Sequence, residues 1–88
     1  MNPRSASPTP EEILAAIVAE ADDGFCARSA LALRFRRVGA RDLRKAIARA
    51  VRAGYVLERR GPDRRLYLAL SSEGWERFRA GPPGQNPA

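Results

Sequence analysis

The sequence predicts a small, mainly α-helical domain with one antiparallel β-hairpin, in the order α-α-α-β-β-α. Two observations support this. Apolar residues recur at helical spacing in segments before residue 54, and two strand-like runs, "YVLERR" and "RLYLAL", follow with "GPDR" between them. The chain of 88 residues suffices for one domain. We expect residues 9 to 80 to hold the fold and residues 1 to 8 and 81 to 88, rich in Pro, Gly, Ser and Asn, to be flexible tails.

The first helix begins with a complete capping signal. Thr9 is placed as the N-cap, Pro10 takes the first helical position, and Glu12 follows three residues after the cap. An apolar face that includes Ile17 continues at helical spacing until "DDG", residues 22 to 24. The sequence therefore predicts a helix that starts at Pro10 and ends before this turn.

Two more helices are expected over residues 27 to 35 and about 40 to 53, with "RRVG" turning the chain between them. Gly54 stands where a helix ending in a left-handed C-cap needs glycine. The inward residues of the later helix follow the spacing 3, 4, 7, 8 and are Leu43, Ala46, Ile47, Ala50 and Val51.

The hairpin is expected to turn at Pro62 and Asp63, which suit the two central positions of a type I turn. Pairing through that turn would align Tyr55 with Leu70 and Leu57 with Leu68 on the inner face, and Glu58 with Tyr67 and Arg60 with Arg65 on the outer face. "SSEGWERF" then predicts a short, Ser-capped closing helix near residues 72 to 79. The expected common core comprises Ile17, Leu31, Leu43, Ile47, Val51, Leu68 and Trp75.

Basic residues are concentrated in the middle of the chain. The net charge is +6, but residues 28 to 65 hold thirteen basic and three acidic residues, a net charge of +10. The rest of the chain has a net charge of −4. A genome biased toward arginine codons would spread arginine evenly, so this concentration indicates a polyanionic partner.

Several classes of function find no support. The single cysteine, Cys26, cannot form an internal disulfide and is expected to pack as a small apolar side chain. Without histidine, the usual zinc sites cannot form, and we find no nucleophile with a base, no phosphate-binding glycine loop and no carboxylate cluster. We therefore expect no enzymatic activity, no metal, no cofactor and no small-molecule ligand. No apolar run approaches the roughly 18 residues of a membrane span, and no secretory signal is visible, so we expect a cytoplasmic protein. The polyanionic partner indicated by the charge would place it at the nucleoid.

The order of elements and two motifs resemble the winged helix-turn-helix superfamily. "LALRFRRVGARDLRKAIARAVRAGYV" resembles the helix, turn, helix and "aGyV" exit of such domains. "LYLALSSEGWERF" is similar to the second wing strand and the "LTxxG" helix start of many bacterial regulators, MarR-like and PadR-like ones among them. The resemblance covers most of residues 9 to 80 and implies a DNA-binding domain. Gly39 departs from the pattern, since Ser or Thr often caps the recognition helix there.

The resemblance gives the basic residues roles. On a helical wheel, the exposed surface of residues 40 to 53 is almost entirely cationic, and in this class the N-terminal part of that helix enters the major groove. The residues expected to contact base edges are Arg41, Lys45 and Ala48. Those expected to contact phosphates are Arg28, Arg36, Arg37, Arg44, Arg49, Arg52, Arg64 and Arg65.

The function expected first is sequence-specific or architectural binding of double-stranded DNA, in transcriptional regulation. Two alternatives stay open: an RNA-binding winged helix, and a protein-interaction module whose arginines meet an acidic partner. The arginines could also be only a solubilising surface. Because one helix contacts few base pairs, we expect a homodimer, with its contact on the first and closing helices.

Overall fold

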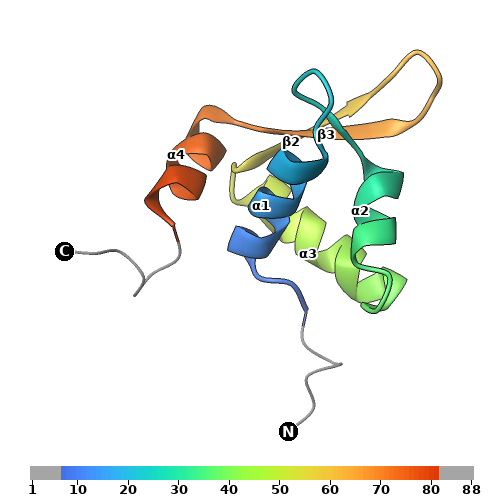
Figure 1. Ribbon diagram of the computed structural model, residues 1–88, viewed down its shortest axis with the longest axis horizontal. Coiled ribbons are helices and arrows are strands. Elements are labelled where there is room, and N and C mark those ends of the chain that lie inside the picture. Colours follow the sequence, from blue (N-terminus) through green and yellow to red (C-terminus); the bar gives the residue numbers. More distant parts are fainter. Residues whose placement is uncertain (1–6, 82–88) are drawn as a thin grey trace, which may run out of the picture.

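The computed structural model describes residues 7 to 81, which form four helices and a three-stranded antiparallel sheet (Figure 1). The elements in chain order are α1 (Pro10–Glu20), β1 (Cys26–Ala27), α2 (Arg28–Arg34), α3 (Ala40–Arg52), β2 (Val56–Arg60), β3 (Leu66–Leu70) and α4 (Ser72–Ala80). Every expected element is present, and β1 is an addition. Most of the expected tails, residues 1 to 6 and 82 to 88, lies outside the described residues; Pro8 is buried.

Helix α1 confirms the capping prediction and forms the centre of the core. The Glu12 N–H donates to Thr9 Oγ1 (3.1 Å), and the Thr9 N–H donates to Glu12 Oε1 (2.8 Å). Ile13 and Leu14 are fully buried, and α1 packs against α2, α3, α4 and the sheet. After α1, the backbone turns tightly through Asp23 (φ 60°) and Gly24 (φ 87°), a geometry typical of a type I′ turn.

Helix α3 ends as the sequence predicted. Gly54 has a φ of 87°, and its N–H donates to the carbonyl of Val51 (3.0 Å). The N–H of Tyr55 donates to the carbonyl of Ala50 (3.0 Å), which completes a Schellman motif. The chain then enters β2, so the end of α3 sets the starting point of the hairpin.

The expected pairing of the hairpin is wrong by one residue. The turn at Pro62 and Asp63 is present, because the Arg64 N–H donates to the carbonyl of Gly61 (2.9 Å). However, Arg64 has a φ of 69° and acts as an added bulge residue, so that Gly61 bonds to the carbonyl of Arg65 (2.8 Å). The observed pairs are Val56 with Leu70, Leu57 with Ala69, Glu58 with Leu68, Arg59 with Tyr67, and Arg60 with Leu66.

This shift reverses the two faces of β2, because neighbouring residues in a strand point to opposite sides. Val56 is 2% exposed and lies in the core, whereas Leu57, expected to point inward, is 56% exposed. The inner face of β3 is as expected, with Leu68 and Leu70 both buried.

The short strand β1 pairs antiparallel with β3 and gives the sheet the order β1-β3-β2. Cys26 lies opposite Leu68 and is fully buried, which confirms that it packs as a small apolar side chain. Burial raises the pKa of its thiol, and the nearby Glu20 adds to that effect. A strand of two residues is too short to show the alternation of apolar and polar side chains that predicts a strand, so the sequence does not predict β1.

Most of the expected core is confirmed, but Trp75 is not part of it. Trp75 is 40% exposed and Val51 is half-buried. Helix α4 instead contacts the domain through Gly74, where an added Cβ would lie 2.0 Å from the carbonyl oxygen of Tyr55. Phe78 packs against the core, and Trp75 lies edge-on against Phe78 with ring centroids 5.9 Å apart.

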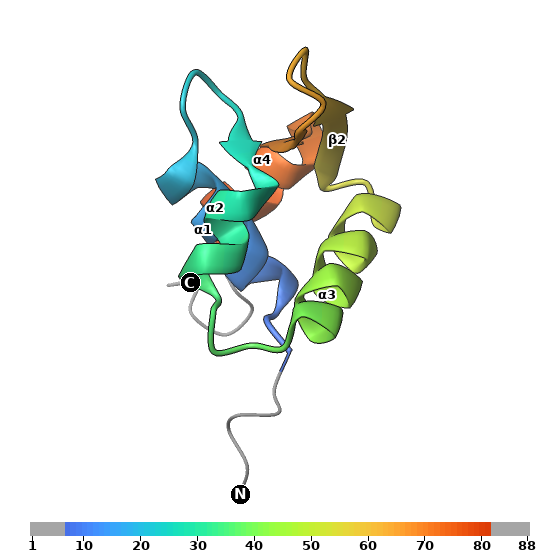
Figure 2. The same cartoon turned by 90° about the vertical axis from the view of Figure 1, so that its right-hand side faces the viewer.

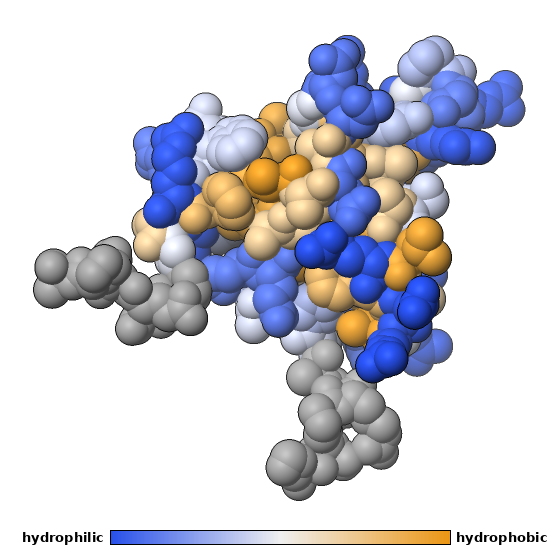
Figure 3. All heavy atoms as spheres, in the orientation of Figure 1, coloured by the Kyte–Doolittle hydropathy of each residue, from blue (hydrophilic) through white to orange (hydrophobic). Residues whose placement is uncertain are grey.

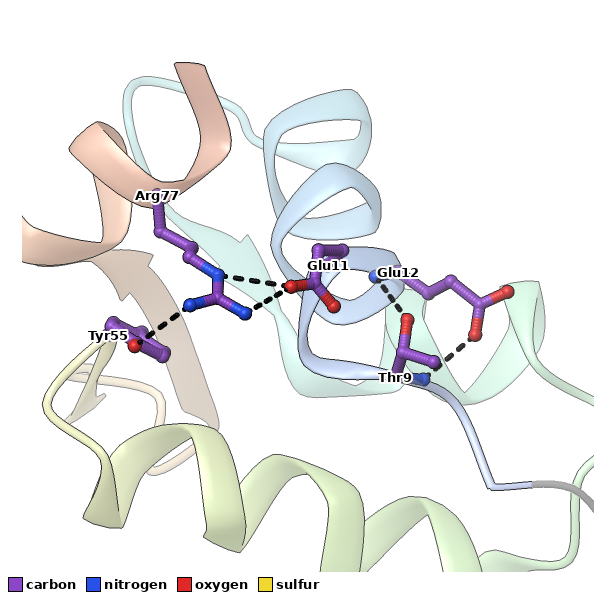
Figure 4. Close-up of polar contacts among 5 residues, drawn as sticks. All are labelled: Thr9, Glu11, Glu12, Tyr55 and Arg77. Atoms are coloured by element: carbon purple, nitrogen blue, oxygen red, sulfur yellow. Dashed lines mark hydrogen bonds and ion pairs between the residues drawn. The ribbon is translucent and has the colours of Figure 1, made fainter. Parts of the chain in front are cut away.

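An ion pair fastens α4 to the start of α1 (Figure 4). The Arg77 guanidinium donates through Nε (3.0 Å) and Nη2 to Glu11 Oε2, and through Nη1 to the Tyr55 hydroxyl (3.4 Å). These hydrogen bonds from Arg77 lower the pKa of the Glu11 carboxyl. Three elements distant in sequence are therefore joined on the side of the molecule occupied by α4.

Candidate nucleic-acid interface

Helix α3 presents a basic surface on the side away from the core. Its Leu43, Ala46, Ile47 and Ala50 are buried, and the helix packs against α1 and β2. Within residues 7 to 81, no basic side chain of α3 forms an ion pair. The exposed residues of α3 that the sequence assigned to nucleic acid are Arg41, Arg44, Lys45, Ala48, Arg49 and Arg52.

A cavity of about 970 Å³ lies between α2, α3 and the hairpin. Figure 2 shows α2 and α3 side by side below the hairpin. Five arginines from different parts of the chain line this cavity, which we call the arginine cavity: Arg28, Arg36, Arg44, Arg60 and Arg65. Val38, Leu43 and Leu66 are part of its apolar wall. Such a converging set of guanidinium groups suits phosphate oxygens, to which Arg can donate two parallel hydrogen bonds.

A second cavity, of about 540 Å³, continues along α3 toward its C-terminal end. Arg28 and Arg44 line both cavities, and the second also contains Ala48 and Arg52. Glu58 from β2 stands on the wall of this second cavity. Among the described residues Glu58 forms no ion pair, so it is a single carboxylate within a basic groove.

Hydrogen bonds hold the tip of the hairpin in shape. Arg60 Nη1 donates to the carbonyl of Arg64 (2.8 Å), and the Arg65 N–H donates to Asp63 Oδ1 (3.1 Å). Asp63 Oδ2 also accepts from the Tyr67 hydroxyl (2.9 Å). The bonds from Arg65 and Tyr67 lower the pKa of the Asp63 carboxyl, because they favour its charged form.

The structure brings part of the expected set together. Arg28, Arg36, Arg44 and Arg65 share the arginine cavity. Arg41 and Lys45 line neither cavity and, by helical geometry, point outward beside Ala48. Arg37, Arg49 and Arg64 are exposed outside both cavities.

Sequence reasoning missed Arg60, which the one-residue error in pairing had placed on the opposite face of the hairpin. Arg60 pairs with Leu66 and lines the arginine cavity. A glycine at position 64 would have indicated the bulge, but the chain has an arginine there. Gly39 caps α3 without a side-chain hydrogen bond, in agreement with its departure from the usual Ser or Thr.

Comparisons with models of protein families, with curated protein sequences and with solved structures found no significant match to this chain. Over residues 7 to 81, no cluster of three or more acidic, cysteine or histidine side chains is suited to a metal ion. No helix in the same range is both long and apolar enough to cross a bilayer. The expected cytoplasmic location stays a prediction.

Proposed function

We propose that this chain is a winged helix-turn-helix domain that binds double-stranded DNA and acts in transcriptional regulation. Helices α2 and α3 form the helix-turn-helix in this proposal, and the β2–β3 hairpin forms the wing. The proposal rests above all on the arginine cavity, where α2, α3 and the hairpin each contribute guanidinium groups to one concave surface. A solubilising surface would not need such convergence from separate elements.

In this proposal, two surfaces of the domain contact the DNA. The outward side chains of α3, Arg41 and Lys45, enter the major groove, where Arg donates to guanine O6 and N7. The adjacent sugar-phosphate backbone passes between α3 and the wing, along the arginine cavity. Ala48 is small and exposed on the same side of α3, which lets the helix approach the bases closely.

The test is a titration of the protein with duplex DNA, duplex RNA and heparin at matched salt. We expect duplex DNA to bind most tightly. Arg44→Ala should weaken duplex binding and reduce the salt dependence by about one unit of slope, because one fewer counterion is released. Arg79→Ala is the matched control: it removes the same charge from an exposed site on α4, outside both cavities.

The two alternatives give different results in this titration. An RNA-binding domain would bind duplex RNA more tightly than duplex DNA. A module for an acidic protein partner would bind heparin as well as DNA, and would be indifferent to base sequence. Equal losses in Arg44→Ala and Arg79→Ala would mean that net charge alone drives binding, and would contradict the proposal.

We further propose that the domain acts as a homodimer through the outer surface of α1 and α4. Figure 3 shows apolar side chains gathered over α1 and beside α4, away from the hydrophilic hairpin. The exposed Ala15 and Ala19 and the half-buried Val18 belong to α1, and the exposed Trp75 belongs to α4. Small residues on α1 allow a second helix to approach closely, and this surface is separate from the basic one.

A further inference from the structure

The outer face of the sheet carries a second candidate site, distinct from α3 and the arginine cavity. The observed pairing places Arg59 directly opposite Tyr67, and both point away from the buried Leu68. Phe25, in the tight turn after α1, is 37% exposed. In Figure 2 this turn and the hairpin rise together at one end of the molecule, above α2 and α3.

Phe25, Arg59 and Tyr67 line a cavity of about 430 Å³ whose floor is completed by hairpin residues 60 to 63. We call it the aromatic pocket. Its size lies within the range of small-molecule and nucleotide sites. The guanidinium carbon of Arg59 lies 6.0 Å from the centroid of the Phe25 ring, so a planar cation is already placed over an aromatic ring.

The Tyr67 ring is held in a fixed position. Its hydroxyl donates to Asp63 Oδ2 (2.9 Å), and its ring edge packs so closely on Gly61 that an added Cβ there would lie 2.7 Å from Tyr67 Cε2. A residue larger than glycine at position 61 would push the ring aside. The pocket therefore has a preorganised aromatic wall rather than a mobile surface side chain.

The charge around the aromatic pocket favours an anionic ligand. Arg59 lines it from the outer face of the sheet, and Arg64 is exposed in the adjoining turn. Asp63 is the one acidic residue in the lining. Both of its oxygens already accept hydrogen bonds, from the Arg65 N–H and the Tyr67 hydroxyl. These hydrogen bonds reduce the repulsion between Asp63 and an anionic ligand.

We propose that the aromatic pocket binds an unpaired base of a single-stranded nucleic acid, with a flanking phosphate on Arg59. A base offers a flat face for stacking on an aromatic or guanidinium group, and its backbone supplies negative charge one nucleotide away. Bases inside a duplex expose only their edges, so a paired base cannot stack here. This site does not depend on duplex binding by α3.

The test compares single-stranded oligothymidylate, single-stranded oligouridylate and a DNA duplex as ligands of the full chain. Phe25→Leu and Arg59→Ala should each weaken single-strand binding about five- to tenfold and leave duplex binding unchanged. Leu57→Ala is the matched control for loss of an exposed apolar side chain on the same sheet face. A third single strand, oligodeoxyuridylate, differs from oligouridylate only in the sugar, and the tighter of these two shows which sugar is preferred.

Nuclear magnetic resonance of the wild type provides a second measurement that needs no variant. Stacking should shift the ring protons of Phe25 and Tyr67 on addition of oligothymidylate, and duplex DNA should shift the resonances of α3 instead. The proposal is overturned if the ring protons do not move, or if Leu57→Ala and Phe25→Leu weaken binding equally. Binding of an aromatic, acidic peptide to the pocket in preference to oligothymidylate would also overturn it. None of these outcomes would affect the duplex test with Arg44→Ala.

Discussion

The basic side chains near α3 carry the same charge but stand in two different places. Arg41 and Lys45 point outward, whereas Arg44 and Arg65 line the arginine cavity. Arg41→Ala or Lys45→Ala should weaken binding to a preferred duplex by about 1 to 3 kcal/mol and affect random-sequence duplexes less. Arg65→Ala should weaken all duplexes alike and lower the salt slope by about one unit. Titrations at two salt concentrations separate these effects, and a uniform response of all variants would contradict the division.

Glu58 is expected to oppose phosphate binding, because it stands in the second cavity with Arg28, Arg44 and Arg52. Removing its charge with Glu58→Gln should strengthen duplex binding about threefold, as expected for one charge at close range in an aqueous groove. Glu76→Gln on α4 changes the net charge equally and is exposed outside the cavity. Fluorescence anisotropy at low salt measures both. Weaker binding of Glu58→Gln would show instead that the carboxylate contacts DNA directly.

At the level of residues, the sequence predicts charge placement well and side-chain direction less well. The helical wheel predicts the buried and exposed sides of α3 correctly, because Leu43 and Ile47 are buried and Arg41 and Lys45 are exposed. Arg60 was missed because its direction depends on a backbone conformation at Arg64 that no side-chain pattern reveals.

Among the elements, α4 depends most on one residue. Ala normally stabilises a helix interior relative to Gly by about 1 kcal/mol. At Gly74 the sign should reverse, because the added Cβ would lie 2.0 Å from the Tyr55 carbonyl oxygen, a backbone atom. Gly74→Ala should cost about 1 to 3 kcal/mol in the free energy of unfolding, measured by urea titration. Glu73→Ala, at an exposed position of the same helix, is the control and should stay within about 0.5 kcal/mol of the wild type.

The elements differ in how far local sequence determines them. Thr9, Pro10 and Glu12 define the start of α1, and Gly54 defines the end of α3, because these signals act through hydrogen bonds between near neighbours. The hairpin register depends on one residue in its loop, and β1 exists only because β3 lies beside it. Trp75 was misplaced because the contact of α4 with Tyr55 is tertiary.

On the scale of the whole molecule, the basic and apolar surfaces lie on different elements, which suits a dimer that leaves both copies of α3 free. Light scattering at micromolar concentration should give twice the 9.7 kDa mass of the chain. Ala15→Glu places a charge at the exposed centre of α1 and should give a folded monomer whose melting temperature no longer depends on protein concentration. Ala53→Glu, exposed after α3, should leave the dimer intact. A wild-type monomer, with and without DNA, would contradict the dimer.

Cys26 makes the motion of β1 measurable in the unmodified protein. It is the chain's single thiol, it is fully buried, and a thiol reagent can reach it only when β1 separates from β3. The labelling rate, divided by that of a free thiol, gives the fraction of time that β1 is open. Arg28 follows β1 directly, two residues after Cys26, and lines both basic cavities. Bound duplex should hold Arg28 in place and slow the labelling of Cys26. DNA binding at the basic surface would then be detected as a lower labelling rate of a buried thiol.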